Sequence, residues 1–238
     1  MKKLVFPFLG IWMLGFSGCM KTSDNIVSFT YEPAIVVSDA FSSQPMIETR
    51  HGKFLAPELS DESFFDEVLL WTEFQINFDQ QPYSNVYTVS NLTYQQIFSA
   101  WAYPRAIDDM ADGGFNDPID YVHFDVKRLR KMVFIWFGHK APKGQTYDYE
   151  MSFDPDETYA IRTLYVRAKK TNELTGNNIE VYTCHGFDIS MLLYNYENAE
   201  ADKVSFNIMY YTGTKGEDGK EIYKGYEFNP LTWWILTD

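Results

Sequence analysis

The feature that most constrains the fold is an alternation of apolar and polar residues with a period of two. In residues 68–78 (VLLWTEFQINF) the even positions are apolar apart from Thr72, and the odd positions after Trp71 are polar. This alternation is typical of a strand with one buried face. It recurs in residues 187–196 and 203–212. These segments predict an all-β chain.

Three further segments also predict local structure. The continuous apolar run at residues 132–137 (MVFIWF) predicts a strand that is covered on both faces. Residues 212–223 (TGTKGEDGKEIY) predict a hairpin, with Asp218-Gly219 at its turn. Residues 94–110 have a mixed, partly helical character that Pro104 interrupts. Helix is therefore expected, if anywhere, in that one segment.

The apolar pattern lapses around residues 106–120, where glycine and proline cluster with acidic residues. Such a composition is typical of a connection between domains. We therefore expect a small OB-like β-barrel over residues 26–98, a linker over residues 99–117 and a β-sandwich over residues 118–238.

The N-terminus has the pattern of a secretory signal. Residues 1–18 combine a positive start, a short apolar segment and small residues before Cys19. The stretch FSGC resembles the bacterial lipobox, in which the cysteine is lipidated, although Phe16 replaces the usual aliphatic residue. We expect lipidation of Cys19, a tether over residues 19–25 and an outer-membrane lipoprotein of the cell envelope; a plain signal peptide is the alternative. The sequence leaves open which side of the membrane the protein occupies.

The charge argues against nucleic acid as a ligand. The chain has 33 acidic and 20 basic residues, a net charge of −13. In residues 24–98 there are eleven acids and only two bases, Arg50 and Lys53. Single-stranded nucleic acid needs a basic groove along its phosphates, so the expected OB-like barrel is not predicted to bind it.

No combination of residues predicts catalysis. Cys184 and His185 are neighbours in an expected strand, so their side chains point to opposite faces and cannot easily pair as nucleophile and base. The four histidines are scattered without the spacing of metal ligands. We therefore expect no catalytic residue, no metal centre, no cofactor and no enzymatic activity.

Acidic residues of the expected linker leave one question open. Asp108, Asp109, Asp112 and Asp117 carry ligands that suit calcium, but they lack the D-x-D-x-D-G order of a calcium loop. A solvated acidic loop is the simpler interpretation. The sequence does not decide between the two.

Aromatic residues are the best candidates for binding. Trp101 and Tyr103 lie in the expected linker, and Trp233 and Trp234 lie near the C-terminus. Flat aromatic rings contact protein partners and sugar rings alike. Core packing is the favoured interpretation for Trp233 and Trp234, so Trp101 and Tyr103 are the predicted binding residues.

Three stretches resemble the NigD-like family of envelope lipoproteins: residues 50–60 (RHGKFLAPELS), 66–76 (DEVLLWTEFQI) and 114–126 (GFNDPIDYVHFDV). His51 replaces the usual aspartate in the first, and the second lacks the usual Gly-Asp-Arg. The resemblance implies an OB-fold followed by a β-sandwich, and a non-catalytic, lipid-anchored protein that binds a protein partner in an immunity-type role. A glycan-binding lipoprotein of a polysaccharide-utilisation system is the alternative function.

Overall fold

The structure is a computed structural model, and it describes residues 25–37, 44–60, 68–80, 86–105, 114–123, 126–157, 161–197, 203–217 and 219–234. The predicted signal, Cys19 and most of the predicted tether lie outside these residues. In the part of the chain that the structure describes, no helix is long and apolar enough to cross a membrane.

The first sheet is antiparallel and has the strand order β3-β2-β1-β4-β5. Its elements are β1 (Ile26–Val37), β2 (Met46–Thr49), β3 (Gly52–Leu55), the short 3-10 helix η1 (Pro57–Leu59), β4 (Leu69–Asn77) and β5 (Val89–Gln96). The N–H of Leu55 donates to the carbonyl of Tyr87 at 2.9 Å, which ties the end of β3 to the segment before β5. The sheet therefore curls around its own core, which contains Ile47, Leu70, Phe74 and Ile76.

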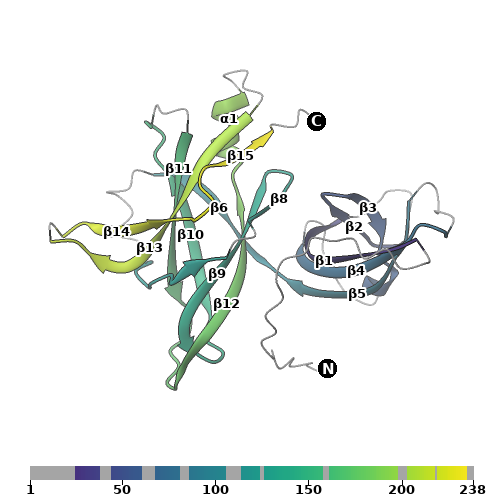
Figure 1. Cartoon of the computed structure of the whole chain (residues 1–238), viewed down its shortest axis with the longest axis horizontal. Helices are drawn as coiled ribbons and strands as arrows, with labels where there is room; N and C mark the ends of the chain where they lie inside the picture. The colour runs from purple at the N-terminus through teal and green to yellow at the C-terminus, as the bar shows by residue number, and fades with distance from the viewer. Residues whose placement is uncertain are drawn as a thin grey trace.

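The second sheet has ten strands in the order β14-β13-β11-β10-β6-β12-β9-β7, with β15 paired to β13 and β8 paired to β9. Its elements are β6 (Phe98–Pro104), β7 (Tyr121–Val122), β8 (Lys127–Leu129), β9 (Met132–Pro142), β10 (Tyr147–Phe153), β11 (Ile161–Lys170), β12 (Asn178–Asp188), helix α1 (Ser190–Glu197), β13 (Lys203–Lys215), β14 (Glu221–Gly225) and β15 (Leu231–Trp234). The sheet is strongly curved, and its concave side holds the larger core of the molecule (Figure 1). The all-β prediction is confirmed.

Several predicted strands are found where the apolar patterns of the sequence placed them. Residues 68–78 correspond to β4, residues 203–212 lie within β13, and residues 132–137 lie within β9. The predicted hairpin joins β13 to β14, and Gly219 has the positive φ of +77° that its turn requires. The period of two was a sufficient guide for β4 and β13, and the unbroken apolar run of β9 reflects apolar packing on both of its faces.

The predicted linker over residues 99–117 needs correction. Residues 98–104 form β6, which pairs in parallel with β10 on one side and with β12 on the other. Only Ile97, which is buried, separates β5 of the first sheet from β6 of the second. The chain therefore runs directly from one sheet into the middle of the other, as Figure 1 shows. The partly helical character expected for residues 94–110 is also wrong for residues 94–104, which are extended.

The strand predicted over residues 187–196 ends early. β12 stops at Asp188, whose carboxylate accepts hydrogen bonds from the backbone N–H and the hydroxyl of Ser190, so it caps the start of α1. Ile189, Leu192 and Leu193 are buried in the core of the second sheet. Their spacing of three and four residues suits one face of a helix, whereas the predicted alternation would have buried Met191, which is 45% exposed.

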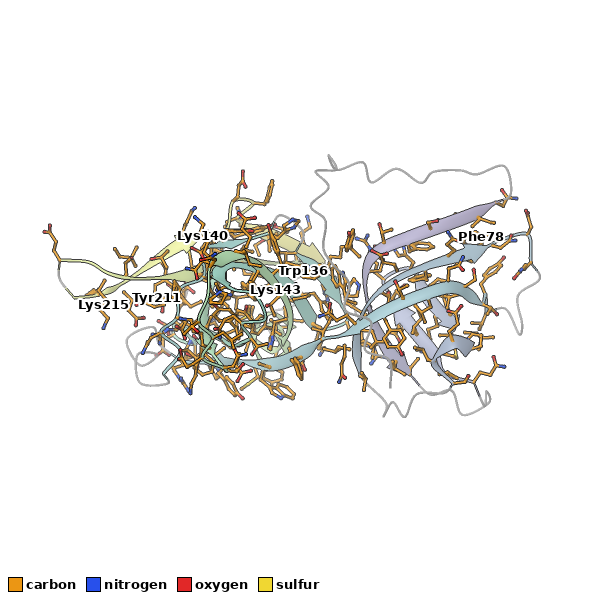
Figure 2. The ribbon with its side chains drawn as sticks, turned by 90° about the horizontal axis from the view of Figure 1, so that it is seen from below. Phe78, Trp136, Lys140, Lys143, Tyr211 and Lys215 are labelled. Atoms are coloured by element: carbon orange, nitrogen blue, oxygen red, sulfur yellow. The ribbon has the colours of Figure 1, made fainter. Side chains whose placement is uncertain are left out.

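The two sheets meet at an apolar cluster. Ile35, Leu69, Trp71 and Ile97 from the first sheet pack with residues of the convex side of the second sheet, namely Leu129, Phe134 and the half-buried Met132, Trp136 and Cys184. A Cβ at Gly186 would lie 3.1 Å from Leu69, so the absence of a side chain there lets β4 approach β12 closely. Figure 2 shows Trp136 at this boundary.

Charged residues reinforce the junction beside the apolar cluster. Lys127 of β8 lies 3.4 Å from the buried carboxylate of Glu32 in β1, and its ammonium stands 5.3 Å from the ring centre of Trp71. Arg130 makes a two-bond ion pair with Glu48 of β2, at 2.8 and 2.7 Å. These cross-links tie the turn between β8 and β9 to the first sheet.

Candidate functional site

The candidate site is the convex side of the second sheet, centred on β6. Ala100 and Ala102 of this strand face the core, so Trp101 and Tyr103 face the opposite way. Both are highly exposed for aromatic residues, at 53% and 48%. Exposed aromatic side chains in the middle of a sheet cost solvation free energy, which makes them the first candidates for a contact surface. Both residues were predicted from the sequence.

Strand pairing shows which side chains flank these two aromatics. Trp101 is paired with Asp188 of β12, and Tyr103 is paired with Ser152 of β10. Ser152 is in turn paired with Tyr165 of β11. Because paired residues of neighbouring strands share a face, these five residues lie on the same convex surface.

Tyrosines extend the surface beyond β6. The rings of Tyr165 and Tyr223 meet edge to face, with their centres 5.2 Å apart, and Tyr223 lies 5.7 Å from the ring of Tyr211. We call the set Trp101, Tyr103, Tyr165 and Tyr223 the aromatic face. Burial raises the pKa of Tyr165, so its hydroxyl stays protonated and is a hydrogen-bond donor across the ordinary pH range.

A buried ion cluster supports the aromatic face from one side. Arg167 of β11 is fully buried and binds the carboxylate of Glu221 at 2.6 Å and the side chain of Asn116 at 2.8 Å. Glu150 of β10 lies 3.9 Å from Arg167, and desolvation raises its pKa although Arg167 and Arg105 oppose that change. Through these bonds Arg167 connects β11 to β14 and to Asn116 beside the aromatic face. In Figure 2 Tyr211 marks the hairpin of β13 and β14, which contributes Glu221 to this cluster.

The structure separates the other chemically suggestive residues. Cys184 packs at the junction between the sheets, whereas His185 contacts Tyr149 and Phe187 in the core of the second sheet. The two side chains therefore lie on opposite faces of β12, as expected. Among the residues that the structure describes, no group of three or more histidine, cysteine or acidic residues could hold a metal ion.

The remaining candidates are the four aspartates of the expected linker and the two C-terminal tryptophans. Asp117 accepts a hydrogen bond from the N–H of Lys170 at 2.7 Å and lies 3.3 Å from its ammonium, so its carboxylate serves the fold. Asp108, Asp109 and Asp112 lie outside the described residues. Trp233 and Trp234 belong to β15, which pairs with β13. Their side chains also lie outside what the structure describes.

Two histidines are buried, and the sequence did not predict burial for either. His139 is within hydrogen-bonding distance of the Pro118 carbonyl (2.8 Å) and of the Tyr149 hydroxyl (2.7 Å), and its ring stacks on Tyr147 at 3.8 Å. His185 is buried, and its Nε2 atom has no hydrogen-bond partner among the described residues. Burial lowers the pKa of each to about 4. The signal that could have found them is their core-facing position in the alternation of β9 and β12.

Tyr165 and Tyr223 were also missed. Each occupies a convex-side position in its strand, and alternation within β11 and β14 could have indicated that. What the sequence lacked was the strand order. β11 and β14 come near β6 because β6 pairs in parallel with β10 and β11 pairs in parallel with β13. These paired strands are far apart in the sequence.

Neither a protein-family model nor a curated protein matches the chain. Solved structures do match it in fold. An uncharacterised protein from Parabacteroides merdae superposes with a TM-score of 0.68 at 14% identity, covering 89% of this chain and all of the other. A protein described as toxin-related, from Parabacteroides distasonis, has a TM-score of 0.58 at 15% identity and covers 87% and 93% of the two chains.

A NigD-like immunity protein from Bacteroides caccae is also similar, with a TM-score of 0.55, 13% identity, and coverage of 90% of this chain and 98% of the other. Coverage of this extent includes both sheets, so the likeness concerns the whole architecture and not one β-domain. At these identities the likeness establishes the fold alone. The resemblance expected from the sequence is therefore confirmed at that level: this chain has the two-sheet, all-β fold of NigD-like proteins.

Proposed function

We propose that this protein is a non-catalytic, lipid-anchored protein of the cell envelope that binds a protein partner through the aromatic face, in an immunity-type role. The observation that carries the proposal is the exposure of Trp101 and Tyr103 at the centre of a ten-stranded sheet. Tryptophan and tyrosine are the residue types that contribute most to protein–protein binding energy. The fold neighbours described as an immunity protein and as toxin-related support a role of this kind.

The composition of the surface also favours a protein partner. Tyrosine and tryptophan combine large rigid contact area with a polar group that forms hydrogen bonds, as in the binding loops of antibodies. The aromatic face presents these types on strands, which lose less conformational entropy on binding than loops do. The lipid anchor at Cys19 would keep the protein at the membrane, where an envelope-directed toxin would meet it.

The test is affinity capture from native envelopes with the full-length protein and mild cross-linking, read out by mass spectrometry. Wild type is compared with Trp101→Ala and Tyr103→Ala, and with Tyr194→Ala as a matched control. Tyr194 is a tyrosine of α1 that is 63% exposed and lies outside the aromatic face. We expect one polypeptide to be captured by wild type and by the control, and to be lost from the other two variants. Capture that survives both substitutions would contradict the proposal, and a specific glycan hit without any protein partner would favour the alternative function.

A further inference from the structure

Trp101 is flanked on both sides by residues that bear carboxylates. On β12 its paired residue is Asp188. On β10 the pairing of Ala102 with Met151 puts Glu150 next to Trp101 on the other side. Neighbouring strands lie about 4.8 Å apart, so the exposed indole is bracketed by two acidic positions on the convex surface.

The two carboxylates are not equivalent. Glu150 lies 3.7 Å from Arg105 and 3.9 Å from Arg167, so its charge already has partners within the protein. Asp188 accepts the two hydrogen bonds of the α1 cap through a single oxygen, Oδ1. Among the residues that the structure describes, its second oxygen has no hydrogen-bond partner, and the side chain is only partly buried. Asp188 can therefore accept a further donor from outside the molecule.

We infer that Trp101 and Asp188 form the docking position for a basic side chain, an arginine or a lysine, of the protein partner. The inference rests on the proposed function and specifies the chemistry of the partner. An indole is the most favourable aromatic surface for a guanidinium or ammonium group, and a neighbouring carboxylate adds a charge-assisted hydrogen bond. An exposed tryptophan beside a carboxylate that can accept a further donor provides both interactions.

The overall charge supports the same partner. At a net charge of −13 the chain attracts basic proteins at long range and repels acidic ones, so association with a basic partner is accelerated at low salt. A neutral sugar would gain from stacking on Trp101 and from donating a hydroxyl to Asp188, but it would gain no charge–charge attraction. The charge of Asp188 is thus the feature that separates a basic side chain from other ligands of an exposed indole.

The experiment titrates the full-length protein, labelled with 5-fluorotryptophan, with N-acetyl-arginine amide, and follows the Trp101 signal by fluorine NMR. N-acetyl-glutamine amide is the neutral control probe. The Trp101 signal is assigned with Trp101→Phe. Asp188→Asn removes the charge while keeping an oxygen that can cap α1. Glu180→Gln is the matched control, because it makes the same change on the same strand and face, about 26 Å away at 3.3 Å per residue.

We expect a saturable shift of the Trp101 signal with the arginine probe and not with the glutamine probe. The apparent Kd should rise about three- to fivefold in Asp188→Asn, the range for a partly exposed ion pair, and stay unchanged in Glu180→Gln. No response of Trp101 to arginine, or an equal response to both probes, would overturn the inference. If arginine fails while a partner is still captured through Trp101, the proposed function stands and only the basic docking position is wrong. If arginine binds but capture does not depend on Trp101, the docking position stands and the proposed function is wrong.

Discussion

Replacing His185 with phenylalanine should make the fold less sensitive to acid. His185 is buried in the core of the second sheet, where burial lowers its pKa to about 4 from an ordinary value of 6.5. Below pH 6.5 the unfolded chain binds a proton at this position that the folded protein does not bind until about pH 4. The unfolded state therefore binds more protons in this window, and the free energy of unfolding falls as the pH falls.

The magnitude follows from those two pKa values. Between pH 7 and pH 5 the differential protonation of one such histidine costs the folded state about 2 kcal/mol. His139, with the same direction and a similar pKa, contributes about as much again by the same linkage. Phenylalanine at position 185 cannot be protonated and replaces a buried nitrogen without a partner among the described residues. Its ring is larger than imidazole, and the packing cost of that size is the same at both pH values. We expect His185→Phe to halve the histidine-dependent loss of stability.

Urea unfolding at pH 7 and at pH 5, followed by far-UV circular dichroism, measures this directly. Relative to wild type, His185→Phe should gain about 2 kcal/mol more at pH 5 than at pH 7. Phe187→Leu is the control, since it alters the same core without changing a titratable group and should lower stability equally at both pH values. If the difference in unfolding free energy between wild type and His185→Phe were the same at both pH values, the reasoning would be refuted.

Three other predictions follow from sequence and structure. Cys19→Ala should move the protein from the membrane fraction to the soluble fraction and remove the acyl mass in intact-protein mass spectrometry; unchanged membrane association would exclude lipidation at this residue. Limited proteolysis should leave residues 97–104 uncut while other segments are cleaved, because they are a buried residue followed by an internal strand; early cleavage there would contradict the strand assignment. Gly138→Ala should cost about 1–3 kcal/mol in thermal unfolding, because the added Cβ would lie 2.3 Å from the ring of Tyr121; Gly225→Ala, whose Cβ meets its neighbours at 3.5 Å, is the control expected to change little.

The sequence predicted the positions of the strands better than it predicted which strands pair with one another. Alternation identified β4 and β13, and the continuous apolar run identified β9, whose side chains pack in apolar clusters on both faces. Alternation failed after residue 188, where Ile189, Leu192 and Leu193 are buried at the spacing of a helix face and Met191, which alternation would bury, is exposed. It also failed at β6, whose small core-facing residues Ala100 and Ala102 gave no apolar signal.

For the candidate site, too, the sequence predicted the residues but not their position in the fold. Trp101 and Tyr103 were identified by residue type, but they were expected in a linker. Their position in the middle of a sheet depends on parallel pairing with strands that lie some 50 and 85 residues further along the chain. Short-range patterns carry no information about such pairings, so neither the support from Arg167 nor the proximity of Asp188 could be predicted.

The central claim is that the aromatic face is the surface through which this protein engages its partner. The most direct measurement places a photo-crosslinking phenylalanine derivative at position 101, and in a second variant at position 194, in cells that naturally produce the protein. Both positions hold exposed aromatic residues, at 53% and 63%. Our account predicts a single covalent adduct with one envelope or extracellular polypeptide from position 101 and none from position 194. Adducts from position 194 alone, or the same adducts from both positions, would contradict it.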